Sequence, residues 1–119
     1  MDDTRPLFQQ IVEQIEDSII DGSLPEETRA PSTNELAAFH RINQATAANG
    51  INKLVADGLL YKKRGVGMFV TAGARDKLVQ RRRDAFGESY IAPLLAEAKR
   101  LEMDADDVKK MIDNWRDEE

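Results

Sequence analysis

The feature that most constrains the fold of this chain is a pair of short helical patterns, one from residue 32 to around 40 and one at 44–57, joined by only about four residues. Ser32 and Glu35 have capping-box spacing, in which the serine side chain accepts from the amide at position 35 and the glutamate reaches back. Asn43 can cap the second pattern. Two helices joined by so short a turn, the second with a small polar outer face, are typical of a helix-turn-helix motif.

The apolar residues of the two patterns predict which sides of the helices are buried. In the first helix, Leu36, Ala37 and Phe39 are expected to point inward. In the second helix, a projection at about 100° per residue places one face toward the core. That face consists of Ala47, Gly50, Ile51, Leu54 and Val55. Asn49 and Asn52 lie opposite and are expected to be exposed.

The flanking sequence predicts another helix before the pair and a β-hairpin after it. Four apolar residues recur at every fourth position before Gly22, which is a natural helix terminator. They are Leu7, Ile11, Ile15 and Ile19. In residues 59–70, apolar strand-formers flank a turn with two glycines, which is typical of a hairpin. Helix, helix-turn-helix and hairpin, in that order, make a winged helix.

The remaining residues form a helical tail. Pro93 interrupts an apolar stripe and predicts a kink near residues 90–93, because proline removes one helical hydrogen bond. A last helix is expected to begin at Asp104. The predicted fold class is therefore mainly α with a small β-hairpin. A winged helix-turn-helix domain occupies residues 1–73 and is followed by a kinked helix and a short C-terminal helix in residues 74–119.

The residues present argue against an enzyme or a metalloprotein. The chain has no cysteine and one histidine, His40, so the clustered ligands of a metal site are missing. No Ser, His and Asp set can be assembled, and the glycines at 65 and 67 lack the following helix of a dinucleotide loop. We expect no catalytic residue, no metal and no cofactor. The sequence also shows neither a bilayer-spanning apolar stretch nor a secretory signal, which favours a cytoplasmic protein without a membrane partner.

The net charge of −5 has the wrong sign for a protein that binds nucleic acid through its overall charge. A DNA partner therefore requires a local concentration of cations, and residues 62–64 and 81–83 supply two clusters. Lys62, Lys63 and Arg64 can contact phosphates, although without the preceding motif they would be an ordinary turn with solubilising side chains. The cluster at 81–83 can face DNA or pair with acidic residues of a partner subunit, and the sequence favours neither.

The second helix of the motif carries groups that can read bases. A helix in the major groove must present short polar donors and acceptors. Gln44, Asn49 and Asn52 supply them, and Thr46 in the first turn suits a phosphate. The alternative for each amide is an ordinary solvated position.

Three stretches together, at residues 6–24, 31–37 and 42–70, resemble the GntR family of bacterial regulators. The short helical tail is similar to that of its YtrA-type branch. The resemblance implies that the recognition helix, the start of the preceding helix and the wing contact DNA. The matching positions are Ser32, Asn34, Asn43, Gln44, Thr46, Asn49, Arg64, Gly65 and Gly67.

The chain also departs from the family pattern. Many members carry arginine where this chain has Asn34, and basic residues where it has Gln44 and Ala48. Base reading by arginine is therefore not expected at those positions, and more weight falls on the amides and the wing. The pattern further favours glycine at position 27 and leucine at position 30, where this chain has Glu27 and Ala30.

The resemblance implies a homodimer on a palindromic site, and the tail supports this independently. Two apolar stripes in a tail of this length cannot both be buried within it, and dimerisation covers them. The predicted dimerisation residues are Leu94, Leu95, Leu101, Val108, Met111, Ile112 and Trp115. The alternative is that the stripes fold back on the winged domain. A small-molecule effector, which the sequence does not identify, would bind at a junction or an interface.

Two functional interpretations follow from these observations. The leading one is a dimeric DNA-binding repressor, with a recognition helix at about 44–57 in the major groove and a wing at 62–68 on the backbone or in the minor groove. The rival is a winged helix that serves as a protein-interaction module without specific DNA binding, which the negative net charge permits.

Overall fold

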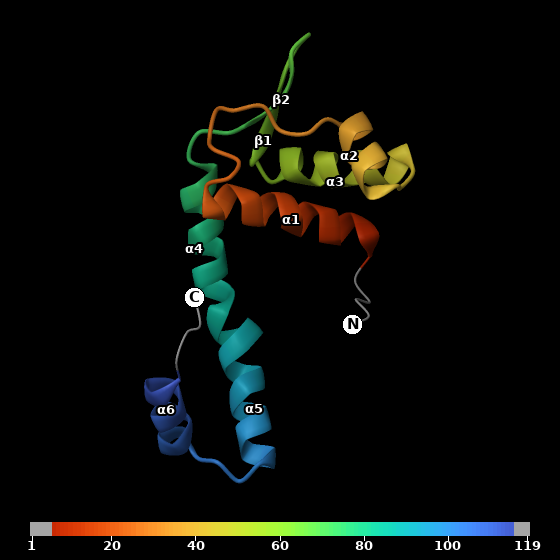
Figure 1. The fold of residues 1–119 in the computed structure, drawn as a ribbon. Helices are drawn as coiled ribbons and strands as arrows, with labels where there is room; N and C mark the ends of the chain where they lie inside the picture. Colours follow the sequence, from red (N-terminus) through yellow and green to blue (C-terminus); the bar gives the residue numbers. More distant parts are fainter. Residues whose placement is uncertain (1–5, 116–119) are drawn as a thin grey trace. The chain divides into compact units, whose positions relative to one another are not determined.

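The computed structural model describes residues 6–115, which divide into two compact units between Gln80 and Arg81 (Figure 1). The elements in chain order are α1 (Leu7–Asp21), α2 (Thr33–His40), α3 (Gln44–Ala56), β1 (Leu60–Lys63), β2 (Gly67–Val70), α4 (Ala74–Phe86), the π-helical turn η1 (Gly87–Ile91), α5 (Ala92–Arg100) and α6 (Ala105–Asn114). The predicted class, mainly helical with one small hairpin, is confirmed. Within residues 6–115, every helix is too short or too polar to span a lipid bilayer.

The core of the first unit is built on the apolar face of α1. Ile11, Ile15 and Ile19 are buried there, as their spacing predicts, and the helix ends at Asp21, directly before Gly22, whose φ of 91° is left-handed. The inner faces of α2 and α3 and the base of the hairpin complete this core. Leu78 on α4 also belongs to it. The first compact unit thus continues to Gln80. The domain boundary expected from the sequence lies at residue 73 and stays a prediction.

The two helices of the motif begin as the sequence predicts. The backbone N–H of Glu35 donates to the Ser32 hydroxyl (3.1 Å), and the Ser32 N–H donates to Oε1 of Glu35 (2.8 Å). At α3, the N–H of Thr46 donates to Oδ1 of Asn43 (2.7 Å). Both caps satisfy amide groups that a helix start leaves without an internal partner. They fix where α2 and α3 start and therefore what their first turns present.

Two residues predicted to point inward are exposed instead. The buried side of α2 is centred between Leu36 and Ala37, and Phe39 lies about 110° from that centre at 100° per residue. Phe39 is 83% exposed. Val55 likewise lies at the edge of the buried face of α3 and is 39% exposed. The prediction of burial was wrong for both: Phe39 was assigned to the core for its hydrophobicity, and the projected face was drawn wide enough to include Val55 at its edge.

The hairpin carries a third strand-like segment that the sequence did not predict. β1 and β2 pair in antiparallel register, with Leu60 opposite Val70 and Lys63 opposite Gly67. Residues 27–30 continue the sheet on the other side of β2. The Glu27 N–H donates to the Val70 carbonyl (2.8 Å), and the Ala30 N–H donates to the Met68 carbonyl (2.8 Å). This pairing gives the wing a broader face than a two-stranded hairpin has.

The beginning of α4 is tied to the first unit by Glu26. Its carboxylate accepts from the N–H groups of Gly73 (2.9 Å) and Arg75 (3.1 Å). Those two amide donors hold the pKa of Glu26 below its usual value. The Arg75 guanidinium also donates through Nε to the carbonyl of Ile20 (2.8 Å). The helix that leaves the wing is therefore anchored at its start to the loop after α1.

In the second unit, the kink expected at residues 90–93 takes the form of a π-helical turn. In η1 the N–H of Ala92 donates to the carbonyl of Gly87, five residues back, and Pro93 follows within the first turn of α5. Proline cannot donate to the carbonyl four residues back and crowds it, and a wider turn accommodates this. Asp104 then caps α6, which turns back alongside α5 (Figure 1).

Candidate nucleic-acid interface

The amides predicted to read bases do not all share one face of α3. Asn49 and Asn52 are exposed together, opposite the buried Ala47. Gln44 is also exposed, but it begins the helix and lies about 140° around the axis from Asn49 at 100° per residue. The outer face of α3 therefore presents two carboxamides, and the third lies at its N-terminal end.

The helix starts place further predicted residues at the surface. Ser32 and Asn43 use one acceptor each for capping, and a hydroxyl or a carboxamide in that position still has hydrogen to donate. Asn34 is exposed in the first turn of α2, whereas Thr46 is half-buried in the first turn of α3. The amino ends of α2 and α3 thus offer short polar groups beside the positive end of a helix dipole.

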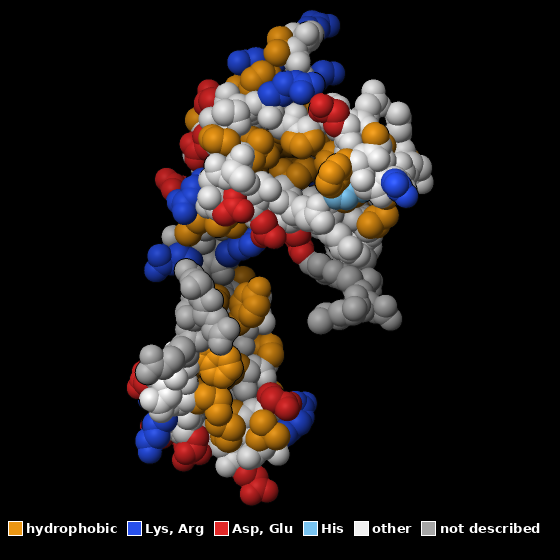
Figure 2. All heavy atoms as spheres, viewed as in Figure 1, with side chains coloured by type: hydrophobic (Ala, Val, Ile, Leu, Met, Phe, Trp, Pro, Cys, Tyr) orange, Lys and Arg blue, Asp and Glu red, His pale blue; other side chains and the backbone are white. Residues whose placement is uncertain are grey.

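The cations of the wing point in different directions. Lys62 and Lys63 are successive residues of β1 and project from opposite faces of the hairpin. The Lys63 ammonium lies over the Phe69 ring, 4.3 Å from its centroid, and Arg64 is exposed in the turn with Gly65. Figure 2 shows blue side chains gathered on the hairpin end of the first unit. Charge of one sign is therefore concentrated there although the whole chain is acidic.

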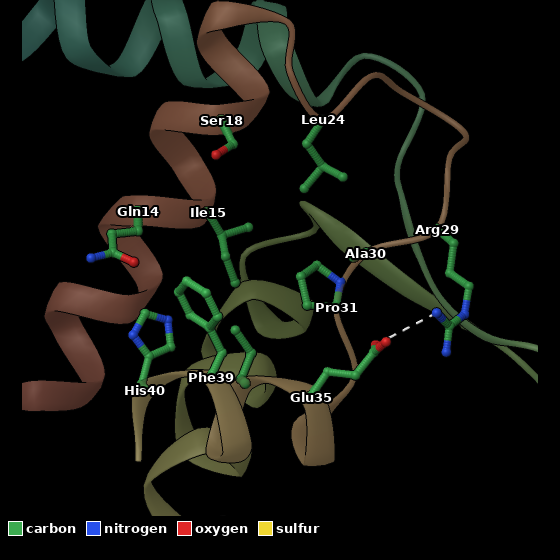
Figure 3. A pocket seen from close by; sticks show the side chains of 11 residues that line it. Gln14, Ile15, Ser18, Leu24, Arg29, Ala30, Pro31, Glu35, Phe39 and His40 are labelled. Atoms are coloured by element: carbon green, nitrogen blue, oxygen red, sulfur yellow. Dashed lines mark ion pairs between the residues drawn. The ribbon is translucent and has the colours of Figure 1, made fainter. Parts of the chain in front are cut away.

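Arg29 also belongs to this surface, although no local sequence pattern indicates it. A Cβ atom at Gly67 would come within 3.1 Å of Nε of Arg29, so the Arg29 side chain lies across the Gly67 backbone. Its guanidinium forms an ion pair with Glu35 (Nη1 to Oε1, 3.5 Å) (Figure 3). Arg29 therefore connects the wing to the first turn of α2. No local pattern predicts the position of Arg29, because that position depends on pairing with a strand about forty residues later in the chain.

The groove beside Arg29 lies between α1, α2 and the loop that joins them, and has a volume of about 560 Å³. Arg29 lies on one side of it, and Phe39 and His40 lie on the other (Figure 3). The His40 ring meets that of Phe39 edge to face, with centroids 5.0 Å apart. Across residues 6–115, no group of three or more acidic or histidine side chains is placed to hold a metal ion.

In the second unit, α5 and α6 enclose an apolar groove of about 300 Å³. Every predicted dimerisation residue except Leu95 contributes to its lining. Most of these side chains remain strongly exposed, including Ile112 and Trp115, the latter at 75%. Figure 2 shows hydrophobic side chains gathered over α5 and α6. The tail thus leaves the predicted apolar residues largely uncovered within one chain.

Comparison with known sequences identifies relatives of the first unit. The pattern described as bacterial regulatory proteins, gntR family, matches residues 7–70. The transcriptional repressor NagR of Bacillus subtilis is 33% identical over 75 residues, which cover 63% of this chain and 31% of NagR. The repressor YtrA of the same organism is 27% identical over 75 residues, which cover 63% of this chain and 58% of YtrA. The chain thus spans about a third of NagR and little more than half of YtrA.

Solved structures resemble both the winged unit and the longer fold. A transcriptional regulator from Oenococcus oeni superposes with a TM-score of 0.80 at 22% identity, covering 96% of this chain and 93% of that one. The DNA-binding domain of AraR, solved in complex with operator ORR3, has a TM-score of 0.55 at 31% identity and covers 60% of this chain and 86% of that one. The family consists of regulators, which confirms the expectation that the chain is no enzyme. Because the family pattern covers more than half of its length, the chain belongs to the gntR family of bacterial regulatory proteins.

Proposed function

We propose that this protein is a sequence-specific transcriptional repressor that binds a palindromic operator as a homodimer. In this proposal α3 enters the major groove and presents Asn49 and Asn52 to base edges. Residues 62–68 lie on the sugar-phosphate backbone or in the minor groove. A bacterial operator lies in the cytoplasm, which is where we expect the protein to act.

The observation that carries the proposal is the connection of the wing to the helix-turn-helix. Arg29 lies across Gly67 of the wing and pairs with Glu35 in the first turn of α2, so both elements border one surface. An acidic protein can bind an anionic duplex only where its cations are concentrated locally. The wing supplies that concentration, and α3 supplies polar groups suited to base edges.

The relatives support the choice of DNA and of repression. NagR and YtrA are both named as repressors, and the AraR domain was solved on an operator. The family pattern covers residues 7–70 of the winged unit, which is the part expected to contact DNA. Each regulator has its own operator sequence and its own regulated genes, so neither is carried over from these relatives.

The exposed apolar groove of the tail supports a homodimer. Isolated apolar residues are common on a protein surface, but a contiguous apolar set marks an interaction surface. A second copy of the tail presents the same set, which is the requirement for a two-fold symmetric interface. Two winged units related by such an axis would match the two halves of a palindrome.

The proposal is tested by comparing Arg64→Ala with Asn49→Ala for binding to duplexes selected from a random pool. Arg64→Ala should weaken binding to every duplex by a similar factor, because a phosphate contact carries no sequence information. Asn49→Ala should change the preferred base at one position, where a bidentate amide contact discriminates by about 1–3 kcal/mol. Lys109→Ala and Asn114→Ala are the matched controls on α6 and should bind like the parent.

Two results would contradict this assignment. If Arg64→Ala and Asn49→Ala both bind like the parent, the DNA-contacting surface lies elsewhere. If the parent itself shows no loss of affinity between 50 and 200 mM salt, DNA is not its partner, since contacts to even ~6 phosphates imply about a thousandfold loss. That outcome would favour the protein-interaction module.

A further inference from the structure

The strand-like segment at residues 27–30 places Arg29 on the same face of the wing as Lys63. Arg29 lies opposite Phe69 in an antiparallel bridge, and Lys63 lies opposite Gly67. Directly paired residues share a face of a sheet, as do residues two positions apart on one strand. Lys63 and Arg29 therefore project from one face, from the strands on either side of β2.

Gly67 provides the space between these two cations. Its φ of 136° is one that residues with a side chain rarely adopt, and a Cβ there would meet the Arg29 guanidinium at 3.1 Å. The Lys63 ammonium is held over the Phe69 ring on the same face. One cation thus lies across the Gly67 backbone and the other over the neighbouring Phe69 ring, and two cations on one face suit a phosphate anion.

The ion pair of Arg29 with Glu35 is loose enough to be exchanged. Its 3.5 Å separation exceeds the roughly 2.7–2.9 Å of a charge-assisted hydrogen bond. The Arg29 side chain is 51% exposed, and a surface ion pair contributes little to stability. Oε1 of Glu35 also accepts from the Ser32 N–H (2.8 Å), so the carboxylate has a second partner when Arg29 leaves.

We propose that Arg29 is a further DNA-contacting residue, which exchanges Glu35 for a backbone phosphate and binds that phosphate together with Lys63 across Gly67. The inference rests on the proposed DNA-binding function and adds a contact that links wing and α2 on the duplex. A guanidinium matches a phosphate with two parallel N–H donors, which a lysine cannot do. Glu35 then acts as a built-in competitor that lowers affinity for any duplex.

The test measures the salt dependence of binding to a labelled duplex of mixed sequence. Arg29→Gln should weaken binding about tenfold at low salt, as loss of a hydrogen bond to a charged group does. It should also reduce the slope of log affinity against log salt by about 0.9, which is the value for one phosphate. Arg100→Gln removes the same charge from an exposed ion pair on α5 and should leave both quantities unchanged.

Glu35→Gln tests the same contact by removing the carboxylate that competes with the phosphate for Arg29. Glutamine also serves in a capping box, so α2 keeps its start, and the loss of the carboxylate should tighten binding severalfold. In the Arg29→Gln background, Glu35→Gln should have a smaller effect, because no guanidinium remains to be released. If Arg29→Gln unfolds the wing, Glu35→Gln in the parent background still decides the matter, because an unchanged affinity would overturn the proposal.

The proposal is overturned if Arg29→Gln keeps the parent's salt slope, or if Glu35→Gln acts equally with and without Arg29. In either case, the proposed DNA-binding function is retained if the parent protein still binds the duplex with a steep salt dependence. A parent without salt dependence would remove the proposed function itself, so the two failures are distinguishable.

Discussion

At the scale of single residues, the features predicted correctly depend on neighbours within one turn of helix. The capping box of Ser32 and Glu35 and the Asn43 cap follow from spacing alone, since each involves groups three positions apart. Phe39 was misplaced because its surroundings depend on how an eight-residue helix is rotated against the core. Rotation is set by packing partners from elsewhere in the chain, which the local sequence does not contain.

The exposure of Phe39 leads to a prediction about stability. Phe39→Ser should change the free energy of unfolding by no more than about 0.5 kcal/mol, the usual range for a surface position. Leu36→Ala, three residues earlier on the buried side, should cost about 2–5 kcal/mol because it leaves a cavity. Urea denaturation of both variants measures the difference. Equal losses would mean that Phe39 is packed against the protein in solution.

At the scale of elements, the sequence predicted the helices and the hairpin from their periodicity and turn residues. It did not predict the strand-like segment at 27–30, which is too short to alternate and pairs with β2 far along the chain. The family pattern favours glycine at position 27, and the structure gives Glu27 a left-handed φ of 65°. Pro93 predicted a disturbed helix, but only the structure shows that it takes the form of η1.

The attachment of α4 to the winged unit gives a prediction for pH dependence. The pKa of Glu26 lies below its usual value of 4.5 when folded, because the N–H groups of Gly73 and Arg75 bind its charged form. A depressed folded pKa stabilises the protein above pH 4.5, and this stabilisation is lost as the pH falls through the folded value. Glu26→Gln should therefore lose less stability than the parent between pH 6 and pH 3.

Urea midpoints measured across that pH range provide the check. Glu88→Gln removes an exposed carboxylate from η1 in the second unit and should follow the parent's pH profile. The account of α4 anchoring is wrong if Glu26→Gln retains the full acid sensitivity of the parent.

At the scale of the whole molecule, function depends on the distribution of charge and not on its sum. The net charge of −5 gives no reason to expect DNA binding, whereas the winged unit concentrates Lys63, Arg64 and Arg29 around one hairpin. The sequence allowed two of these three residues to be predicted, because they precede a glycine turn directly after a helix-turn-helix. It also predicted the apolar residues of the tail, but not that all except Leu95 line one groove.

The central claim is that two copies of the winged unit contact the two halves of one operator, and hydroxyl-radical footprinting of the selected duplex tests it most directly. The account predicts two protected half-sites related by a dyad, with centres one helical turn or a multiple of it apart. Ile112→Asp, which places a charge in the apolar groove of the tail, should abolish this symmetric pattern at the same protein concentration. A single asymmetric footprint, or none at a concentration that saturates binding, would contradict the account.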